Sequence, residues 1–259
     1  MKNIKKISII ASFIILAMSF TSCKGKEPSS EVKMSDSVEK AEFTYSIIDE
    51  TYTEEGITIK FPQLIKASNE AKVDSINKAI QESIRMKLDS LRMGNEDMGD
   101  FSLNLKYEMT EYDNKVLSIV YKGISHFEKA AYPVNIYYTQ NITLDEVYNL
   151  PLKAIFTIDN DFIEAFKSGN YSPYTDELDL ENSGVNIKET IESQYSNKDL
   201  VKLFQNDEVN YKLTMYGVIV SIEVPHAIGD HLEMAIPYEA VESNMIKSSP
   251  VWKDYLFIK

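Results

Sequence analysis

The sequence predicts an α+β fold in which antiparallel sheets pack against helices, in two adjoining small modules. In the first half, pairs of alternating apolar and polar segments surround one long amphipathic segment. In the second half, short helical segments come first and alternating pairs follow. The chain is 44% hydrophobic and 26% charged, which is typical of a globular protein, and 259 residues suffice for one large domain or two small ones.

The N-terminal module is expected to span residues 41–141 and to contain one long helix. Residues 69–93 carry apolar side chains three or four positions apart, close to the period of a helix, and Asn69 or Ser68 would cap the start. We read this apolar stripe as core. Strands are predicted at 43–48, 57–61, 101–112, 116–121 and 134–141, with turns at Gly56 and at Asp113-Asn114, and with Pro62 ending the second strand.

The C-terminal module is expected to span residues 142–259, with helices first and strands last. Helical segments are predicted at 161–167, 186–195, 199–204 and 240–246, and residues 144–148 form a helical turn or a strand end. Residues 168–184 are polar, acidic and rich in turn formers, so we predict a long surface loop there. Strands are predicted at 209–213, 218–223 and 232–236.

The N-terminus has the pattern of a lipoprotein export signal. Three lysines precede an apolar run over residues 9–20, which is shorter than the roughly 20 residues of a membrane-spanning helix. Thr21 and Ser22 are small residues directly before Cys23. We predict a signal peptide at 1–22, a lipid (palmitate) anchor on Cys23, and a flexible tether at 23–40 rich in Gly, Pro, Ser, Glu and Lys. The protein would then lie on the extracytoplasmic face of the cell membrane; an uncleaved anchor with a chance cysteine is the alternative.

The net charge restricts the partners. The chain carries −13, and loss of residues 1–22 would remove three lysines and no acid, which gives −13 minus 3, or −16. Such a charge disfavours nucleic acid and anionic lipid head groups, so we expect membrane contact through the lipid alone. It favours cationic partners. The alternative is that the negative charge only keeps the protein soluble.

No catalytic constellation stands out, and we expect no cofactor, no catalytic residue and, on balance, no enzymatic activity. The single cysteine is assigned to the lipid, and the three histidines lack a Gly-x-Ser-x-Gly segment. Glycine motifs that cradle phosphate are absent from the sequence. A carboxylate pair for glycoside hydrolysis stays open, because spacing in sequence does not give separation in space.

Two groups of residues are candidate metal ligands, and for both we favour a structural reading, so no metal site is expected. Imidazole and carboxylate ligands occur close together in the first group: Glu223, His226, Asp230, His231 and Glu233. The second group lacks the glycine and the spacing of a calcium loop: Asp176, Glu177, Asp179 and Glu181. His126 alone reads as a structural or solvent-facing residue.

Tyrosines are numerous, 16 against one tryptophan. Several fall around the predicted module junction and the acidic loop: Tyr132, Tyr137, Tyr138, Tyr171 and Tyr174. Tyrosine is favoured at interfaces, but it is equally a strand-forming residue, and the latter interpretation is preferred.

Short motifs over residues 57–241 resemble the extracellular domain of the anti-sigma-V factor, a lysozyme sensor whose related modules occur in lipoproteins and in a peptidoglycan deacetylase. They comprise Gly123-Ile124-Ser125-His126, Ala130-Ala131-Tyr132-Pro133, Thr143-Leu144-Asp145, Pro225-His226-Ala227-Ile228-Gly229 and Pro237-Tyr238. The family often has Gly-Gly-Ala-His in the first of these motifs, of which only the first glycine and the histidine are kept here. The cytoplasmic segment and membrane span of the anti-sigma factor are missing, so the resemblance does not imply binding of a sigma factor.

We therefore predict a lipid-anchored envelope protein that binds or senses a ligand: lysozyme, another cationic protein or a peptidoglycan component. The alternatives are an envelope enzyme or enzyme accessory module acting on peptidoglycan, and a structural lipoprotein without a specific ligand. Clustered buried acids in a cleft would favour the enzyme, and an acidic face with exposed tyrosines would favour the binder.

Overall fold

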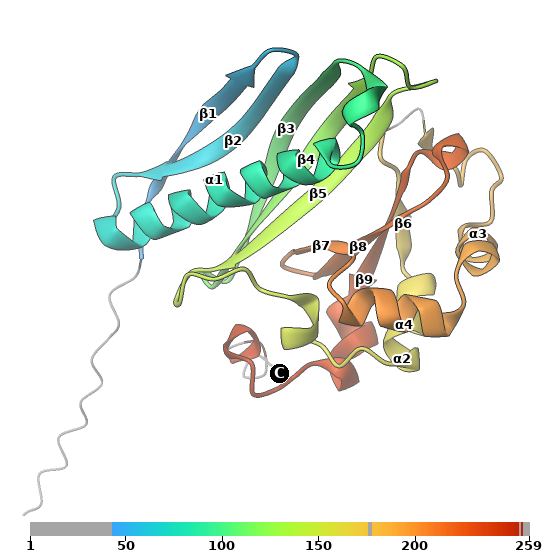
Figure 1. Cartoon of the computed structure of the whole chain (residues 1–259). Coiled ribbons are helices and arrows are strands. Elements are labelled where there is room, and N and C mark those ends of the chain that lie inside the picture. The colour runs from blue at the N-terminus through green and yellow to red at the C-terminus, as the bar shows by residue number, and fades with distance from the viewer. Residues whose placement is uncertain (1–42, 176–177, 254, 256–259) are drawn as a thin grey trace, which may run out of the picture. The chain divides into compact units, whose positions relative to one another are not determined.

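The fold contains two β-sheets with helices packed on them, which confirms the α+β class (Figure 1). The computed structural model describes residues 43–175, 178–253 and 255, all within one compact unit that spans 42–259. The predicted signal peptide, Cys23 and the tether lie outside the described residues. Within the described ranges, no helix is both long enough and apolar enough to cross a membrane.

The first sheet has five strands in the order β1-β2-β3-β4-β5. They are β1 (Ser46–Glu54), β2 (Ile57–Ile65), β3 (Phe101–Tyr112), β4 (Val116–Phe127) and β5 (Val134–Thr143). Neighbouring strands are antiparallel except β2 and β3, which run parallel over three residues because the long helix α1 connects them. Residues 113–115 form the loop between β3 and β4, and Asp113 and Asn114 in it both have φ of 50°, as a tight hairpin turn requires.

Helix α1 (Glu70–Arg92) covers one face of this sheet, as Figure 1 shows. The Asn69 side chain accepts a hydrogen bond from the Lys72 amide, so the predicted cap is confirmed. The apolar stripe is buried against the sheet through Val73, Ile76, Ile80, Ile84 and Leu88.

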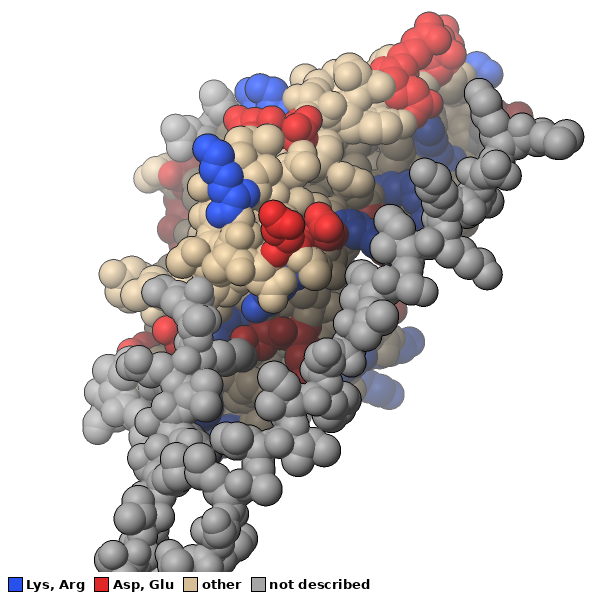
Figure 2. All heavy atoms as spheres, turned by 90° about the vertical axis from the view of Figure 1, so that its left-hand side faces the viewer, with Lys and Arg blue, Asp and Glu red and all other residues tan. Residues whose placement is uncertain are grey.

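The solvent side of α1 carries charged residues of both signs. Lys78 and Glu82 are 3.8 Å apart, and so are Arg85 and Asp89, each pair one helical turn apart. Figure 2 shows acidic and basic side chains interspersed on the face that it displays. The charge on that face is therefore mixed.

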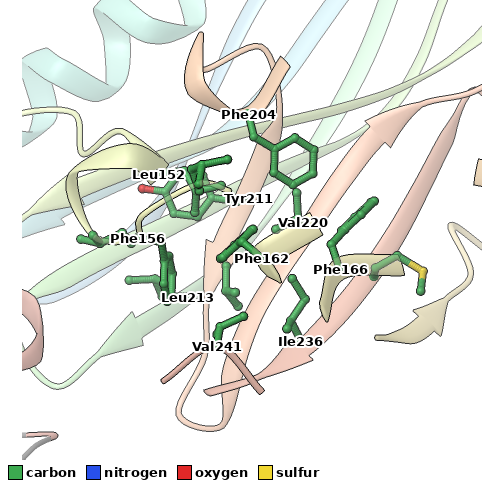
Figure 3. Packing of buried hydrophobic residues seen from close by; sticks show 14 of the residues in the cluster. Leu152, Phe156, Phe162, Phe166, Phe204, Tyr211, Leu213, Val220, Ile236 and Val241 are labelled. Carbon is green, nitrogen blue, oxygen red and sulfur yellow. The ribbon is translucent and has the colours of Figure 1, made fainter. Parts of the chain in front are cut away.

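The second sheet has four strands in the order β6-β9-β8-β7, all antiparallel. Its strands are β6 (Asn170–Ser172), β7 (Asn210–Leu213), β8 (Gly217–Glu223) and β9 (His231–Pro237). The α-helices of this half are α2 (Asn160–Lys167), α3 (Ile187–Gln194) and α4 (Asn197–Gln205). This half also has 3-10 turns at Leu152–Ala154, His226–Ile228, Tyr238–Asn244 and Pro250–Trp252, and another such turn, Glu96–Met98, precedes β3 in the first half. Phe162, Phe166 and Phe204 from α2 and α4 pack over Val220 and Ile236 of the sheet (Figure 3).

Three expectations about elements need correction. Pro62 lies within β2 and does not end it, because the pairing with β3 has already stopped at Ile59 and no second neighbour needs the missing N–H. Residues 168–184 are not only a loop, since β6 pairs there with β9. The last predicted helix, at 240–246, is a 3-10 turn over Tyr238–Asn244.

Candidate functional site

The two sheets direct polar faces toward each other. Side chains alternate along a strand, so Leu117 and Ile119 of β4 face α1, while Ser118 and Lys122 face the second sheet. In the second sheet, Val220 and Ile222 face the helices, and Ser221 lies on the other face beside Glu233. We call the facing residues the polar interface: Thr110, Ser118, Lys122, Tyr137, Thr139 and Asn141 from the first sheet, and Asn210, Lys212, Ser221 and Glu233 from the second.

Directional hydrogen bonds join the edge strand β7 to the first sheet. Asn210 accepts from the Thr139 amide at 3.0 Å and donates to the Tyr137 carbonyl at 3.0 Å, so its side chain pairs with the open edge of β5 as a strand would. The Tyr211 amide donates to Thr139 Oγ1 at 2.9 Å. Thr110 Oγ1 donates to the Leu213 carbonyl at 2.8 Å. These bonds fix the position of β7 against the first sheet.

A buried ion pair lies in the middle of the polar interface. Glu233 is 2% exposed, and its Oε1 lies 3.0 Å from Lys122 Nζ. Burial raises the pKa of Glu233, and the nearby Lys122 cation opposes that shift without cancelling it. Lys122 also lies over the rings of Tyr137 and Tyr174, 5.2 and 5.4 Å from their centroids.

The polar interface holds buried groups that lack partners. Within the described ranges, Ser221 Oγ and, at the edge of this interface, His231 Nδ1 have no hydrogen-bond partner. Burial lowers the pKa of His231 to about 4, so the ring is neutral at pH 7. Burial, and then the Glu233 charge, raise the pKa of Tyr137. Both rings are therefore neutral hydrogen-bonding groups at pH 7.

Tyr174, which follows β6, connects its segment of the chain to the first sheet. Its hydroxyl accepts from the Gly123 amide at 2.9 Å and lies 2.8 Å from the Gly123 carbonyl and 3.0 Å from that of Ile136. Burial raises the pKa of Tyr174 to about 12. Gly123 is required there, because a Cβ atom would fall 1.8 Å from the Asn104 carbonyl oxygen.

Two of the motif segments meet at one end of the polar interface. Tyr132 stacks on His226 with ring centroids 3.9 Å apart and planes within 8°. Asp230 contacts His226 Nδ1 at 3.0 Å and accepts from the Asn135 amide at 2.8 Å. Segments that are distant in sequence therefore form one loop junction, in which Tyr132 is 50% exposed.

An acidic groove of about 540 Å³ lies at the end of the first sheet. Four carboxylates line it, from Glu54, Glu55, Asp100 and Glu128, together with Arg92 and His126. Arg92 is 2.8 Å from Glu54 and neutralises part of this charge. His126 contacts the Ala130 carbonyl at 3.4 Å, so the groove adjoins the loop that carries Tyr132.

The remaining candidate ligands are dispersed. His226 and Asp230 pair with each other, whereas Glu233 pairs with Lys122, and no group of three or more His, Cys, Asp or Glu residues in the described ranges is placed to hold a metal. Asp179 accepts hydrogen bonds from Asn182 and Ser183 within its own turn. Asp176 and Glu177 lie outside the described residues.

The tyrosines of interest divide between surface and interior. Tyr137 is buried in the polar interface, and Tyr138 packs beside Tyr121 on the α1 side and bonds to Ser83. The Tyr171 hydroxyl donates to the Leu178 carbonyl at 2.8 Å. Among these five tyrosines, only Tyr132 is an exposed aromatic side chain.

Sequence reasoning missed the Lys122–Glu233 pair and the acidic groove. A signal existed for the pair, since Lys122 and Glu233 are charged residues that each stand in a strand between apolar or glycine neighbours. The groove gave no signal, because its carboxylates come from three separate segments of the chain.

Comparison with known proteins finds structures with a similar fold, and the names of those proteins do not indicate an activity. No family model matches the sequence, and no curated protein matches it. The chain is structurally similar to proteins of the DUF3298 family. A crystal structure of a member from Bacteroides fragilis has a TM-score of 0.46 and 18% identity, with 81% of this chain and 95% of that chain covered. Another, from Pseudomonas aeruginosa, has a TM-score of 0.48 and 11% identity, with 78% and 93% covered.

Proposed function

We propose that this protein is a lipid-anchored binding module of the cell envelope that captures a cationic protein, with lysozyme as the first candidate. The observation that carries the proposal is the acidic groove, which adjoins the loop that carries the exposed Tyr132. The anchor is predicted on Cys23 from the sequence alone.

The groove has the charge that a lysine or arginine side chain requires. Its four carboxylates face two groups that can be positive, Arg92 and His126. The whole chain carries −13, so the long-range field also attracts a cation. Charge complementarity of this kind speeds encounter and weakens as salt is added.

Apolar side chains beside the groove supply an anchor for such a contact. Ile124 and Tyr132 are 49% and 50% exposed; Ile124 lies two residues before His126 of the groove, and Tyr132 lies in the loop after β4. Interfaces commonly place exposed aromatic and aliphatic residues inside a polar rim. The stack on His226 holds the Tyr132 ring in one orientation, which lowers the entropy cost of binding.

Calorimetry of residues 24–259 with lysozyme at low and moderate salt tests the proposal. We expect saturable binding that weakens with salt. The double variant Asp100→Asn with Glu128→Gln should bind roughly fivefold more weakly, the equivalent of about 1 kcal/mol for two exposed ion pairs. Asp74→Asn with Glu82→Gln on α1 removes the same charge elsewhere and should bind as the parent does. No heat at either salt concentration refutes lysozyme capture, and equal loss in both variants refutes the groove.

A further inference from the structure

The first sheet has an open edge along β1. This strand lies at the end of the sheet and, in the part of the chain that the structure describes, pairs only with β2 (Figure 1). The pairing runs through nine consecutive residues of β1 without a bulge. The strand contains neither proline nor lysine, which commonly keep other strands away from an edge. The backbone of β1 is therefore suited to pairing with a further strand.

The pairing with β2 determines which backbone groups point to the open edge. Glu54 and Ile57 flank a two-residue turn, so they form a hydrogen-bonded pair. Such pairs alternate along an antiparallel ladder, so the even-numbered residues of β1 bond to β2. Pro62, which has no N–H, lies opposite Asp49 and agrees with this assignment. Four residues of β1 therefore direct their N–H and C=O groups to the open edge: Ile47, Asp49, Thr51 and Thr53.

The charge of β1 restricts the strand that can pair with it. The strand carries three carboxylates and no cation, from Asp49, Glu50 and Glu54. A second copy of β1 would bring two such sets together, and like charges on neighbouring strands are destabilising. A strand that carries lysine or arginine gains where these others lose. Glu54 also lines the acidic groove, so the edge leads into the groove.

One face of β1 alternates apolar and acidic side chains. Ile48 and Tyr52 are 39% and 40% exposed, and they share a face with Glu50 and Glu54 because every second side chain of a strand points the same way. Directly opposite side chains on neighbouring strands interact. The best partner therefore alternates basic and apolar side chains on that face, which puts a basic residue at every fourth position.

We propose that β1 is a docking edge that takes up an extended basic segment of a partner protein as an additional strand. The main-chain groups of the four outward residues hold the segment, and the acidic side chains select it. The inference deepens the proposed function and rests on it for the sign of the partner's charge.

Amide hydrogen exchange of the full chain, followed by NMR, tests the docking edge with a peptide as long as β1, nine residues. The peptide has lysine at its first, fifth and ninth positions, valine midway between the lysines, and threonine elsewhere. We expect the amides of Ile47, Asp49, Thr51 and Thr53 to become protected at saturation, while the even-numbered amides, already bonded to β2, change little. No such protection overturns the proposal. Protection before the peptide is added also overturns it, because another segment or a second copy would then occupy the edge.

Two control peptides separate strand pairing from charge. Proline in place of every valine and threonine keeps the charge but prevents a strand, and should weaken binding about tenfold or more. Glutamate in place of every lysine keeps the strand and should abolish binding. Equal binding of the proline peptide overturns strand pairing, and equal binding of the glutamate peptide overturns selection by charge.

A matched pair of variants tests the edge from the side of the protein. Thr51→Pro removes an outward N–H and leaves the bonds to β2 in place, whereas Thr51→Val keeps the N–H. The first should weaken peptide binding about tenfold or more, and the second should stay within about twofold. Retained protection of the Tyr52 amide shows that β1 of Thr51→Pro is still paired with β2. Unchanged affinity of Thr51→Pro overturns the docking edge.

Failure of this inference is distinguishable from failure of the proposed function. The variant Asp100→Asn with Glu128→Gln alters the groove and leaves β1 intact, so the peptide should still protect the four outward amides. Peptide protection without any heat from lysozyme refutes lysozyme capture and supports the edge. Lysozyme binding without peptide protection supports the groove and overturns the edge.

Discussion

Removal of Lys122 provides a direct test of the polar interface. The variant Lys122→Met keeps most of the side-chain volume and removes the charge that faces Glu233 at 3.0 Å. Glu233 is 2% exposed, so water cannot replace the lost cation without opening the interface. The carboxylate is left buried without its counter-charge.

The expected loss follows from the geometry of the pair. Breaking a buried ion pair by removing one partner costs about 3–5 kcal/mol. The Lys122 side chain is 24% exposed, so part of the pair's field is already screened, and we expect the lower value, about 3 kcal/mol at pH 8. Burial raises the pKa of Glu233 above the ordinary value of a glutamate carboxyl, 4.5, and loss of Lys122 raises it further. A carboxyl whose pKa is higher in the folded than in the unfolded chain lowers the stability of the folded state as the pH rises through the folded-state pKa. The cost of the variant should therefore shrink as the pH falls toward 4.5.

Urea unfolding, followed by tryptophan fluorescence at pH 8 and at pH 5, measures both effects. Trp252 is the only tryptophan, is fully buried, and donates to the Ile155 carbonyl at 2.8 Å, so its emission reports on unfolding. The control Lys106→Met removes an exposed lysine directly beside Lys122 in the sheet and should cost less than about 0.5 kcal/mol. An equal cost of Lys122→Met at the two pH values, or a cost no larger than the control's, would refute the reasoning.

Four further predictions follow from single residues. Ile76→Ala leaves a cavity beneath α1 and should cost about 3 kcal/mol in urea unfolding; a cost under 1 kcal/mol would contradict the packing. Asn69→Ala removes the helix cap and should cost about 1 kcal/mol by the same assay, whereas no change would mean that the cap contributes nothing. Gly123→Ala forces a Cβ against the Asn104 carbonyl and should lower the melting temperature measured by circular dichroism; an unchanged value would show that β3 and β4 can separate at no cost. The His231 ring should titrate by NMR near pH 4, so its contribution to stability is present above pH 6.5 and is lost as the pH falls through 4; a midpoint near 6.5 would contradict burial.

Local patterns determine α1 and the β3–β4 hairpin, and both could be predicted. The helix ends within one residue of its expected bounds, because an apolar stripe and an Asn cap coincide. The hairpin turn follows from Asp113 and Asn114, which tolerate positive φ better than other residues with side chains. The three-residue strand β6 has no such pattern, and it forms only because the edge of β9 is available.

The candidate sites depend on pairings that no local pattern contains. Lys122 and Glu233 are more than a hundred residues apart, and nothing near either residue specifies the other. Gln140 reads in the sequence as one polar position of a strand. That its Oε1 lacks a hydrogen-bond partner in the described residues follows only from the fold, in which Ala79 and Asn149 accept hydrogen bonds from the Nε2 end of the amide.

The contacts along β3, β4 and the second sheet explain why two polar faces can hold together. At the hairpin end, Tyr112 packs edge-on against Tyr238 and Trp252, with centroids 5.8 and 5.7 Å away, so the second core extends onto the first sheet. In the middle, the contacts are hydrogen bonds and the Lys122–Glu233 pair. Apolar packing is tolerant of small shifts, whereas hydrogen bonds and buried charges are not, because a displaced polar group loses its partner without regaining water. The apolar end therefore supplies the affinity of one sheet for the other, and the polar middle selects a single relative position.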